Sequence, residues 1–201
     1  MSEERSTRGE SYTRRLETLG EAGWKQWLDV QAPYRRHVRG LDLGFVLDVG
    51  CGIGRNLVHL QNNGVGVDHN ADSVAAARER GCEAFVPADF GASEYAVAGR
   101  FDSLLCAHVV EHMSLDEAVQ MIASYLQYLR AGGRVVLIAP QQAGYRTDAT
   151  HVEFMDPPKL ARILEGAGAP QERAYSFPFP RFVGHVFPHN EFVAIGRKAP
   201  A

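Results

Sequence analysis

The 201-residue sequence has only three cysteines, and no apolar run approaches the roughly 18 residues that a membrane-spanning helix requires. Cys51, Cys82 and Cys106 lie within or beside apolar segments, which indicates free thiols and not a disulfide framework. The first eleven residues are polar and charged, so they lack the apolar segment of a secretory signal. We therefore expect a cytoplasmic protein that makes no use of a membrane.

An excess of positive charge is also absent. The sequence has 21 lysines and arginines and 24 acidic residues, which gives a formal net charge of -3. This net charge argues against electrostatic binding of nucleic acid, although it does not exclude a local basic patch. Hydrophobic residues make up 45% and charged residues 22%, and the length suits one domain with a full core and a cap.

Two regions differ in their pattern. Aromatic and aliphatic residues recur among basic ones over residues 12–40, which predicts one or two amphipathic helices broken near Gly20 and Pro33. We expect residues 1–40 to form a tail and helical cap, and residues 41–201 to form the core domain. Trp24 and Trp27 fit either a cap over an acceptor pocket or a helix buried on the sheet.

From residue 45 onward, short apolar runs alternate with helical patterns. Strands are expected at 45–49, 64–68, 83–89, 101–107, 134–140, 174–179 and 191–198, and helices at 55–63, 71–81, 114–133 and 156–168. Ser114 and Glu117 form a capping box, and Gly132-Gly133 is expected to end the helix. This order predicts a Rossmann-like, doubly wound α/β fold with seven strands, mostly parallel, and an antiparallel hairpin at one edge.

A glycine-rich turn, "LDVGCGIGRN" (47–56), joins the first strand to the first helix. Three glycines would let a ligand approach the backbone closely, and Asp68 at the tip of the second strand is placed to bind ribose hydroxyls. A tight turn without a ligand is the alternative. Arg55 occupies the position where a dinucleotide fingerprint has a small residue, so a nicotinamide cofactor is disfavoured.

The spacing G-x-G-x-G after Asp48 resembles motif I of the class I S-adenosylmethionine-dependent methyltransferases. The resemblance covers roughly residues 45–196, with "LDVGCGIG", "GVDHN", "PADF", "FDSLLCAHVVEHM" and "LRAGGRVVLIAP". It implies S-adenosylmethionine as the cofactor. The implied donor-binding residues are Asp48 at the ammonium group, Gly50, Gly52 and Gly54 at the methionine, Asp68 at the ribose, His69 beside the adenosine, Asp89 at the adenine amine, and the backbone of Ala107 near the methyl group.

The segment "AHVVEHM" (107–113) follows the fourth strand, where ligands of a doubly wound sheet gather. Three interpretations stay open. In the first, Glu111 and His112 support the loop; in the second, His108 or His151 is a general base; in the third, His108, Glu111, His112 and His151 hold a metal. If 108–112 forms a helical turn, His108, Glu111 and His112 share one face, and His151 would supply a fourth ligand.

The same cluster resembles the small-RNA 2′-O-methyltransferases, in which a Glu-x-x-Glu-His cluster and a later histidine bind a divalent metal. This chain departs at the first position, where His108 replaces the glutamate, and it lacks that family's larger RNA-binding parts. The resemblance therefore implies metal assistance but not an RNA substrate. Three histidines with one carboxylate suit zinc or a borderline transition ion better than magnesium.

We therefore expect a methyltransferase that acts on a hydroxyl of a small molecule or saccharide. The alternatives are a non-catalytic adenosylmethionine-binding module and a methyltransferase acting on RNA, although the net charge makes a nucleic acid partner unexpected. The segment 176–190, rich in Phe, Pro and His, would either wall the acceptor pocket or form the surface of a homodimer.

Overall fold

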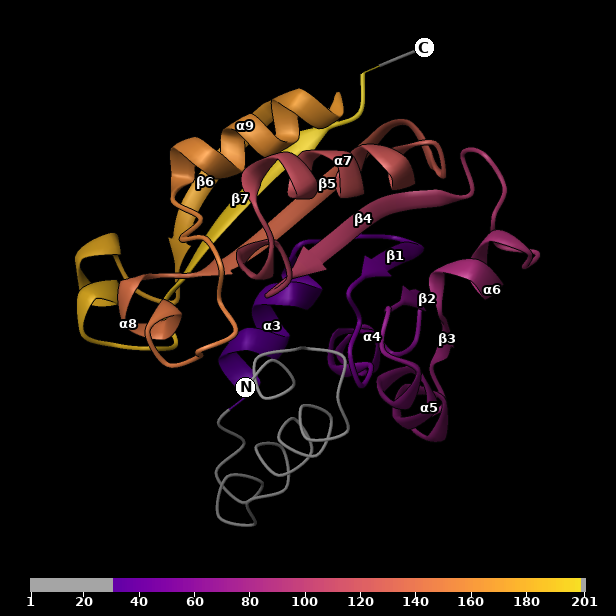
Figure 1. Cartoon of the computed structure of the whole chain (residues 1–201), viewed down its shortest axis with the longest axis horizontal. Helices are drawn as coiled ribbons and strands as arrows, with labels where there is room; N and C mark the ends of the chain where they lie inside the picture. The colour runs from indigo at the N-terminus through magenta and orange to yellow at the C-terminus, as the bar shows by residue number, and fades with distance from the viewer. Residues whose placement is uncertain (1–30, 200–201) are drawn as a thin grey trace. The chain divides into compact units, whose positions relative to one another are not determined.

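The computed structural model describes residues 31–199 (Figure 1). The strands of this part of the chain form a seven-stranded sheet in the order β3-β2-β1-β4-β5-β7-β6, in which β7 runs antiparallel to both of its neighbours. The expected Rossmann-like fold with its antiparallel edge hairpin is therefore confirmed. No helix within the described range is both long and apolar enough to span a membrane.

The chain divides into two compact units, and the boundary falls within β1 (Val46–Val49). Unit 1 contains the residues up to Asp42 together with Asp48–Ser93, and unit 2 contains Leu43–Leu47 and the chain from Glu94 onward. The expected cap over residues 1–40 is described only in part, as the helix α3 (Ala32–Gly40). Trp24 and Trp27 lie outside the described residues.

In unit 1, β2 (Gly64–Val67) pairs in parallel with β3 (Glu83–Phe85), and all four residues of β2 are buried. The helices of this unit are α3, α4 (Arg55–His59), α5 (Ala71–Glu79) and α6 (Pro87–Gly91). The α3 helix packs on α4, where the Tyr34 hydroxyl donates to Asn56 Oδ1 at 3.1 Å and Arg39 Nε donates to the His59 carbonyl at 2.6 Å.

The third strand is shorter than the sequence pattern predicts. It ends at Phe85, and Pro87 then occupies the start of α6, so that Asp89 lies in the first turn of a helix and not at a strand end. Proline has no N–H to donate to a strand ladder, and its fixed φ favours the first turn of a helix. The expected strand over 83–89 was therefore wrong after residue 85, and the Asp89 side chain is exposed.

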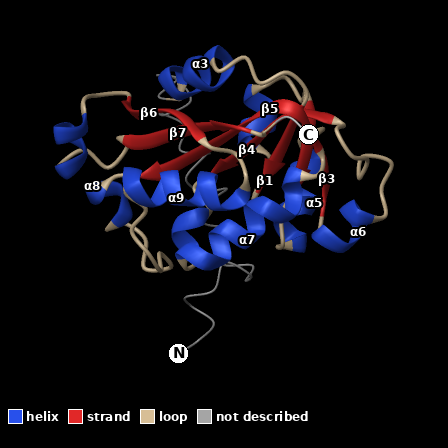
Figure 2. Cartoon of the chain, turned by 90° about the horizontal axis from the view of Figure 1, so that it is seen from above, coloured by secondary structure: helices blue, strands red, loops and turns tan. Residues whose placement is uncertain are grey.

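In unit 2, β4 (Phe101–Ala107) pairs in parallel with β5 (Leu129–Pro140), as expected for a buried α/β core. On its other side β5 pairs in antiparallel fashion with β7 (Glu191–Arg197), and β7 pairs in the same way with β6 (Gln171–Phe177). The helices α7 (Leu115–Leu126) and α9 (Pro157–Ala167) lie side by side along these strands (Figures 1 and 2). Gly166 lets them approach, because an added Cβ would lie 3.0 Å from the side chain of Val119.

The start of α7 was predicted correctly and its end was not. The capping box is present, with the Ser114 N–H donating to Glu117 Oε2 at 2.8 Å. The helix ends at Leu126, however, and β5 begins at Leu129, which pairs with Phe101. The pairing register shifts between Phe101 and Ser103, so Gly132 and Gly133 lie at an irregularity in the strand and do not cap a helix. Sheet pairing outweighs the local helical pattern here.

Candidate active site

The glycine-rich turn of unit 1 requires its glycines. Gly50, Gly52 and Gly54 have φ values of +76°, +52° and +79°, a region that L side chains rarely adopt. At Gly54 an added Cβ would also lie 2.7 Å from Cys82 Sγ, so both conformation and space exclude a side chain. The N–H of Gly50 donates to the Val67 carbonyl at 2.7 Å, which fixes the turn to the end of β2.

Asp68 locks the same turn. Its Oδ2 accepts the Gly52 N–H at 2.8 Å, and its Oδ1 accepts the Asn70 N–H at 2.8 Å. Asn70 in turn caps α5 by accepting the N–H groups of Asp72 and Ser73. His69 follows with its Nδ1 3.7 Å from Asp68 Oδ1, and its side chain is about half exposed. Asp68 therefore orders the turn before any ligand is bound.

Replacement of Asp68 by alanine is expected to weaken binding of S-adenosylhomocysteine roughly ten-fold or more. Two backbone N–H groups lose their acceptor, so the free energy of unfolding should also fall by about 1–3 kcal/mol. Calorimetry and urea unfolding measure the two effects. Glu79→Ala, which removes an exposed carboxylate at the end of α5, serves as the control. Unchanged donor affinity in Asp68→Ala would contradict the ribose-binding role.

Asp48 is the buried acid of the turn. Burial of its carboxyl raises the pKa to about 7, and the opposing effects of the Asn56 side chain and the Arg55 charge do not cancel this. An ammonium group placed beside it would stabilise the ionised form. Asp48, the three glycines, Asp68 and His69 all belong to unit 1, as does the exposed Asp89.

In unit 2, His108 follows Ala107 at the carboxyl end of β4. Ala107 is buried, and the His108 N–H continues the strand ladder by donating to the Ile138 carbonyl at 2.9 Å. His108 has a φ of +60°, which costs about 1–3 kcal/mol for a residue with a Cβ and is found most often at functional sites. The chain therefore leaves β4 at His108 in a left-handed backbone conformation.

The His108 imidazole lies between two carboxylates. Its Nε2 is 2.8 Å from Glu191 Oε1, and its Nδ1 is 3.6 Å from Glu111 Oε1. Burial lowers the pKa of His108, but the carboxylates of Glu191 and Glu111 outweigh burial and raise the pKa to about 9. Glu191 is the first residue of β7 and lies 83 residues from His108 in the sequence. No local sequence pattern predicted that it would contact His108.

Replacing Glu191 by glutamine is expected to lower the free energy of unfolding by about 1–3 kcal/mol at pH 7, because a largely buried imidazolium loses its charged partner. Urea unfolding measures this loss. Glu172→Gln is the matched control, since Glu172 pairs with Arg197 where both side chains are about half exposed, and such a pair contributes at most about 1 kcal/mol. Equal stability of the two variants would show that the His108–Glu191 contact contributes no more than a surface pair.

Glu111 lies on the short 3₁₀ turn η2 (Val110–His112) and is fully buried. Its carbonyl accepts the N–H groups of Val152 and Glu153 at 2.8 and 3.2 Å, which brings the loop that carries His151 against the turn. The nearest imidazole nitrogens to its carboxylate, His108 Nδ1 at 3.6 Å and His151 Nε2 at 3.9 Å, are too distant for hydrogen bonds. No described residue donates a hydrogen bond to either carboxylate oxygen.

The two other histidines are anchored through Nδ1. His151 Nδ1 lies 2.6 Å from the Tyr145 carbonyl, which can only accept, so Nδ1 carries the proton and Nε2 faces Glu111. His112 Nδ1 lies 3.3 Å from the Thr150 carbonyl and 3.1 Å from its hydroxyl. Burial lowers the pKa of His112, which favours the neutral imidazole that a metal requires.

One ligand atom from each of Glu111, His112 and His151 lies within 4.8 Å of the other two. The structure thus brings together three of the four metal ligands considered from the sequence, and His108 is not among them. The Tyr145 carbonyl orients the His151 imidazole, and the Thr150 hydroxyl orients that of His112. The sequence pattern indicated neither group. Tyr145 ends the short helix α8 (Gln142–Tyr145), which no pattern predicted, and its ring stacks on His151 with centroids 5.0 Å apart.

The chain is similar to known proteins both in the sequence around the glycine-rich turn and in its fold. Residues 46–133 match the model of a family described as "Methyltransferase domain". No curated protein matches the sequence significantly. Many solved structures share the fold, although their low sequence identities show no more than that.

Three of these structures illustrate the likeness. A putative methyltransferase, solved in complex with the Haloferax volcanii Trm112 methyltransferase activator, has a TM-score of 0.71 at 14% identity, with 98% of this chain and 99% of that chain covered. A TehB-like SAM-dependent methyltransferase from Corynebacterium glutamicum gives 0.65 at 21% identity, with 94% and 97% covered. A SAM-dependent methyltransferase from Archaeoglobus fulgidus gives 0.63 at 17%, with 82% and 93% covered.

The family match begins at the first residue of β1, includes the whole glycine-rich turn and its acid, and extends through β4 and the cluster at its end. The sheet that carries these elements has the order and the antiparallel β7 of a methyltransferase core. Over residues 46–133 the chain is thus similar to the methyltransferase-domain family, and it shares its fold with S-adenosylmethionine-dependent methyltransferases.

Proposed function

We propose that this enzyme transfers the methyl group of S-adenosylmethionine to a hydroxyl oxygen of a small molecule or saccharide, and that a divalent metal ion held by Glu111, His112 and His151 assists the transfer. The observation that carries the proposal is the environment of Glu111. Its fully buried carboxylate accepts no hydrogen bond from the described residues and faces His151 Nε2 at 3.9 Å. Because Nδ1 of that imidazole is committed to the Tyr145 carbonyl, Nε2 is the ring nitrogen that would bind a metal.

A buried carboxylate without a hydrogen-bond donor is unfavourable, and His108 Nδ1 at 3.6 Å from Glu111 Oε1 is too distant to donate one, so a cation bound between Glu111 and His151 would compensate the charge further. Two imidazoles and one carboxylate form a donor set typical of catalytic zinc, which leaves a further coordination position for substrate. Anchoring of imidazoles through the opposite ring nitrogen is also typical of metal-binding histidines. The residues present therefore fit a transition ion or zinc.

The proposed roles follow from these positions. The turn at Gly50–Gly54 and the carboxylates of Asp48 and Asp68 bind the donor. A bound divalent ion supplies Lewis acidity, which lowers the pKa of a coordinated hydroxyl. The Tyr145 carbonyl and Thr150 hold His151 and His112 in orientation, and Glu191 holds His108. In the transfer, an acceptor oxygen attacks the methyl carbon in line, the carbon–sulfur bond breaks with its electron pair passing to sulfur, S-adenosylhomocysteine leaves, and the hydroxyl proton passes to water.

The central experiment is transfer of an isotope-labelled methyl group from the donor into a metabolite extract, with mass analysis of the labelled products. We expect a labelled methyl ether. A labelled amine or labelled RNA would overturn the hydroxyl assignment. If no product gains a methyl group, the chain is a donor-binding module without this activity.

Metal assistance is tested separately by removing metal with a chelator and restoring zinc or manganese ions one at a time. Activity should fall on chelation and return with a suitable ion. A chelated enzyme with full activity would exclude the metal and favour a histidine as the general base.

A further inference from the structure

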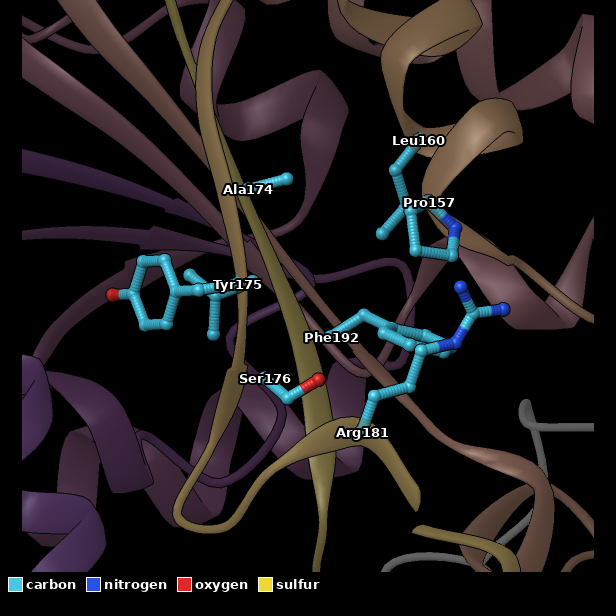
Figure 3. Close-up of a pocket in the computed structure, with 8 residues that line it drawn as sticks. Pro157, Leu160, Ala174, Tyr175, Ser176, Arg181 and Phe192 are labelled. Atoms are coloured by element: carbon cyan, nitrogen blue, oxygen red, sulfur yellow. The ribbon is translucent and has the colours of Figure 1, made fainter.

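A cavity of about 200 Å³ lies in unit 2, between α9, the edge strand β6, its neighbour β7 and the connection from β6 to β7 (Figure 3). Leu160 and Pro157 form one wall, Phe192 forms the floor, and Ala174 and Ser176 line the side of β6. These residues share one face because Ala174 pairs with Ala194 and Ser176 pairs with Phe192 across the antiparallel ladder. Figure 3 shows the Tyr175 ring on the opposite side of the same strand.

Arg181 is the single charged side chain of this lining. It lies on the 3₁₀ turn η3 (Arg181–His185) and places its guanidinium over the Phe192 ring, 5.5 Å from the centroid. It makes no ion pair with any residue of the described range 31–199. A cation therefore stands beside an apolar cavity without an anionic partner from this part of the protein.

The acidic residues near the start of α9 do not supply that partner. The Asp156 carboxylate caps α9 by accepting the Lys159 N–H at 3.0 Å, and Glu153 pairs with the Lys159 ammonium at 2.7 Å. Both carboxylates are thus engaged by α9 itself. The charge of Arg181 is available to a ligand.

The turn that carries Arg181 is held firmly. Asn190, which is fully buried, accepts the Phe179 N–H at 2.9 Å and donates to the carbonyls of Phe179 and Pro180. The buried Gln141 side chain donates to the Ser176 hydroxyl and to the Glu191 carbonyl, each at 2.9 Å. These contacts hold the backbone that leads into Arg181 and the strand ends beside the cavity, while the exposed Arg181 side chain contacts the Phe192 ring.

We propose that this cavity binds a small carboxylate whose apolar body is about the size of one aromatic ring, with the carboxylate at Arg181 and the ring against Leu160 and Phe192. A dry cavity of about 150 Å³ is enough to hold benzene, so a cavity of this volume holds one ring with a short substituent. Guanidinium groups bind carboxylates with two parallel hydrogen bonds, which selects this charge over a neutral polar group. The inference does not depend on the identity of the methyl acceptor.

The test is a titration of the full ¹⁵N-labelled chain with 3-phenylpropanoate, followed by amide chemical shifts, beside the same titration with neutral 3-phenylpropanamide. We expect saturable shifts for Leu160, Ala174 and Ser176, with the amide binding roughly five-fold or more weakly. The absence of saturable shifts at these residues, or equal affinity for acid and amide, would overturn the proposal.

Two variants sharpen the test. Ala174→Leu should fill the cavity from an exposed position on the edge strand and abolish the shifts, whereas Arg181→Gln should reduce the affinity for the acid to that for the amide. Arg162→Gln, which removes an exposed arginine of α9 outside the lining, should leave binding unchanged. Binding that persists in Ala174→Leu, or that is indifferent to Arg181→Gln, places the ligand elsewhere. Thermal unfolding of each variant confirms that the fold is intact.

Discussion

Replacing Glu111 by glutamine is expected to reduce methyl transfer by roughly a hundred-fold or more and to remove bound metal. The change keeps the shape of the side chain but removes its negative charge, so the two imidazoles are left without the carboxylate that completes the ligand set. Activity with labelled donor and elemental analysis of the purified protein measure the two effects. Glu165→Gln, which alters an exposed glutamate on α9, is the matched control for both.

The free energy of unfolding of Glu111→Gln distinguishes a metal-binding role of Glu111 from a purely structural one. In metal-free protein the Glu111 carboxylate is buried without a hydrogen bond from the described residues, and its charge is attracted to His108 at 3.6 Å. A neutral amide removes both the burial of a charge and this attraction, so the free energy of unfolding should change little. If Glu111 instead serves to hold His108, the same substitution should destabilise the metal-free protein. A destabilised variant that retains its activity would refute the metal site.

Replacing Asp48 by asparagine is expected to remove a strong pH dependence from the stability of the ligand-free protein. The pKa of the Asp48 carboxyl rises from 3.8 to about 7 on folding, because burial outweighs the favourable effects of Asn56 and Arg55 and Asp68 adds a like charge. The folded state thus binds a proton that the unfolded chain releases between pH 3.8 and about 7. Stability from this group is present below pH 3.8 and is lost as pH rises through about 7, by up to ~4 kcal/mol.

Urea unfolding at several pH values between 4 and 8 measures this effect as the difference between the native protein and Asp48→Asn. The variant should be the more stable of the two at pH 8, and the difference should shrink toward pH 4. Adding S-adenosylhomocysteine should reduce the difference if its ammonium group pairs with the carboxylate. Asp72→Asn, which removes an exposed carboxylate at the start of α5, is the control. Parallel pH profiles for the native protein and Asp48→Asn would contradict the prediction.

Local patterns in the sequence predicted the elements whose signals lie within a few residues of one another. The apolar run over 101–107 became β4 with the same bounds, and the capping box at Ser114 and the N-cap at Asp156 both begin helices. The glycine-rich turn was recognised in the same way, because backbone positions with positive φ or with close neighbouring atoms favour glycine, and glycine is visible in the sequence. Short-range chemistry was enough for these features.

Other boundaries depended on partners far along the chain. The helical pattern that continues past Leu126 gave way to β5, because Leu129 pairs with Phe101 on the neighbouring strand. Asp89 moved from a strand into α6 because Pro87 cannot donate to the ladder. In the first case pairing with a neighbouring strand set the boundary of the element, and in the second the loss of that pairing did. Strand pairing joins distant residues, so it cannot be read from a short segment of sequence.

The sequence by itself determined the fold class, the glycine-rich turn with its acids, and the placement of His108, Glu111 and His112 at the end of the fourth strand. Only the tertiary structure decided how these side chains combine. The pairing of Pro140 with Glu191 sets the register that brings the Glu191 carboxylate to His108, and the two N–H groups that bind the Glu111 carbonyl bring His151 to the cluster. These contacts join residues that are 41 positions apart (Glu111 and Val152) to 83 positions apart (His108 and Glu191), so they arise from packing of the completed sheet and not from any pattern along the chain.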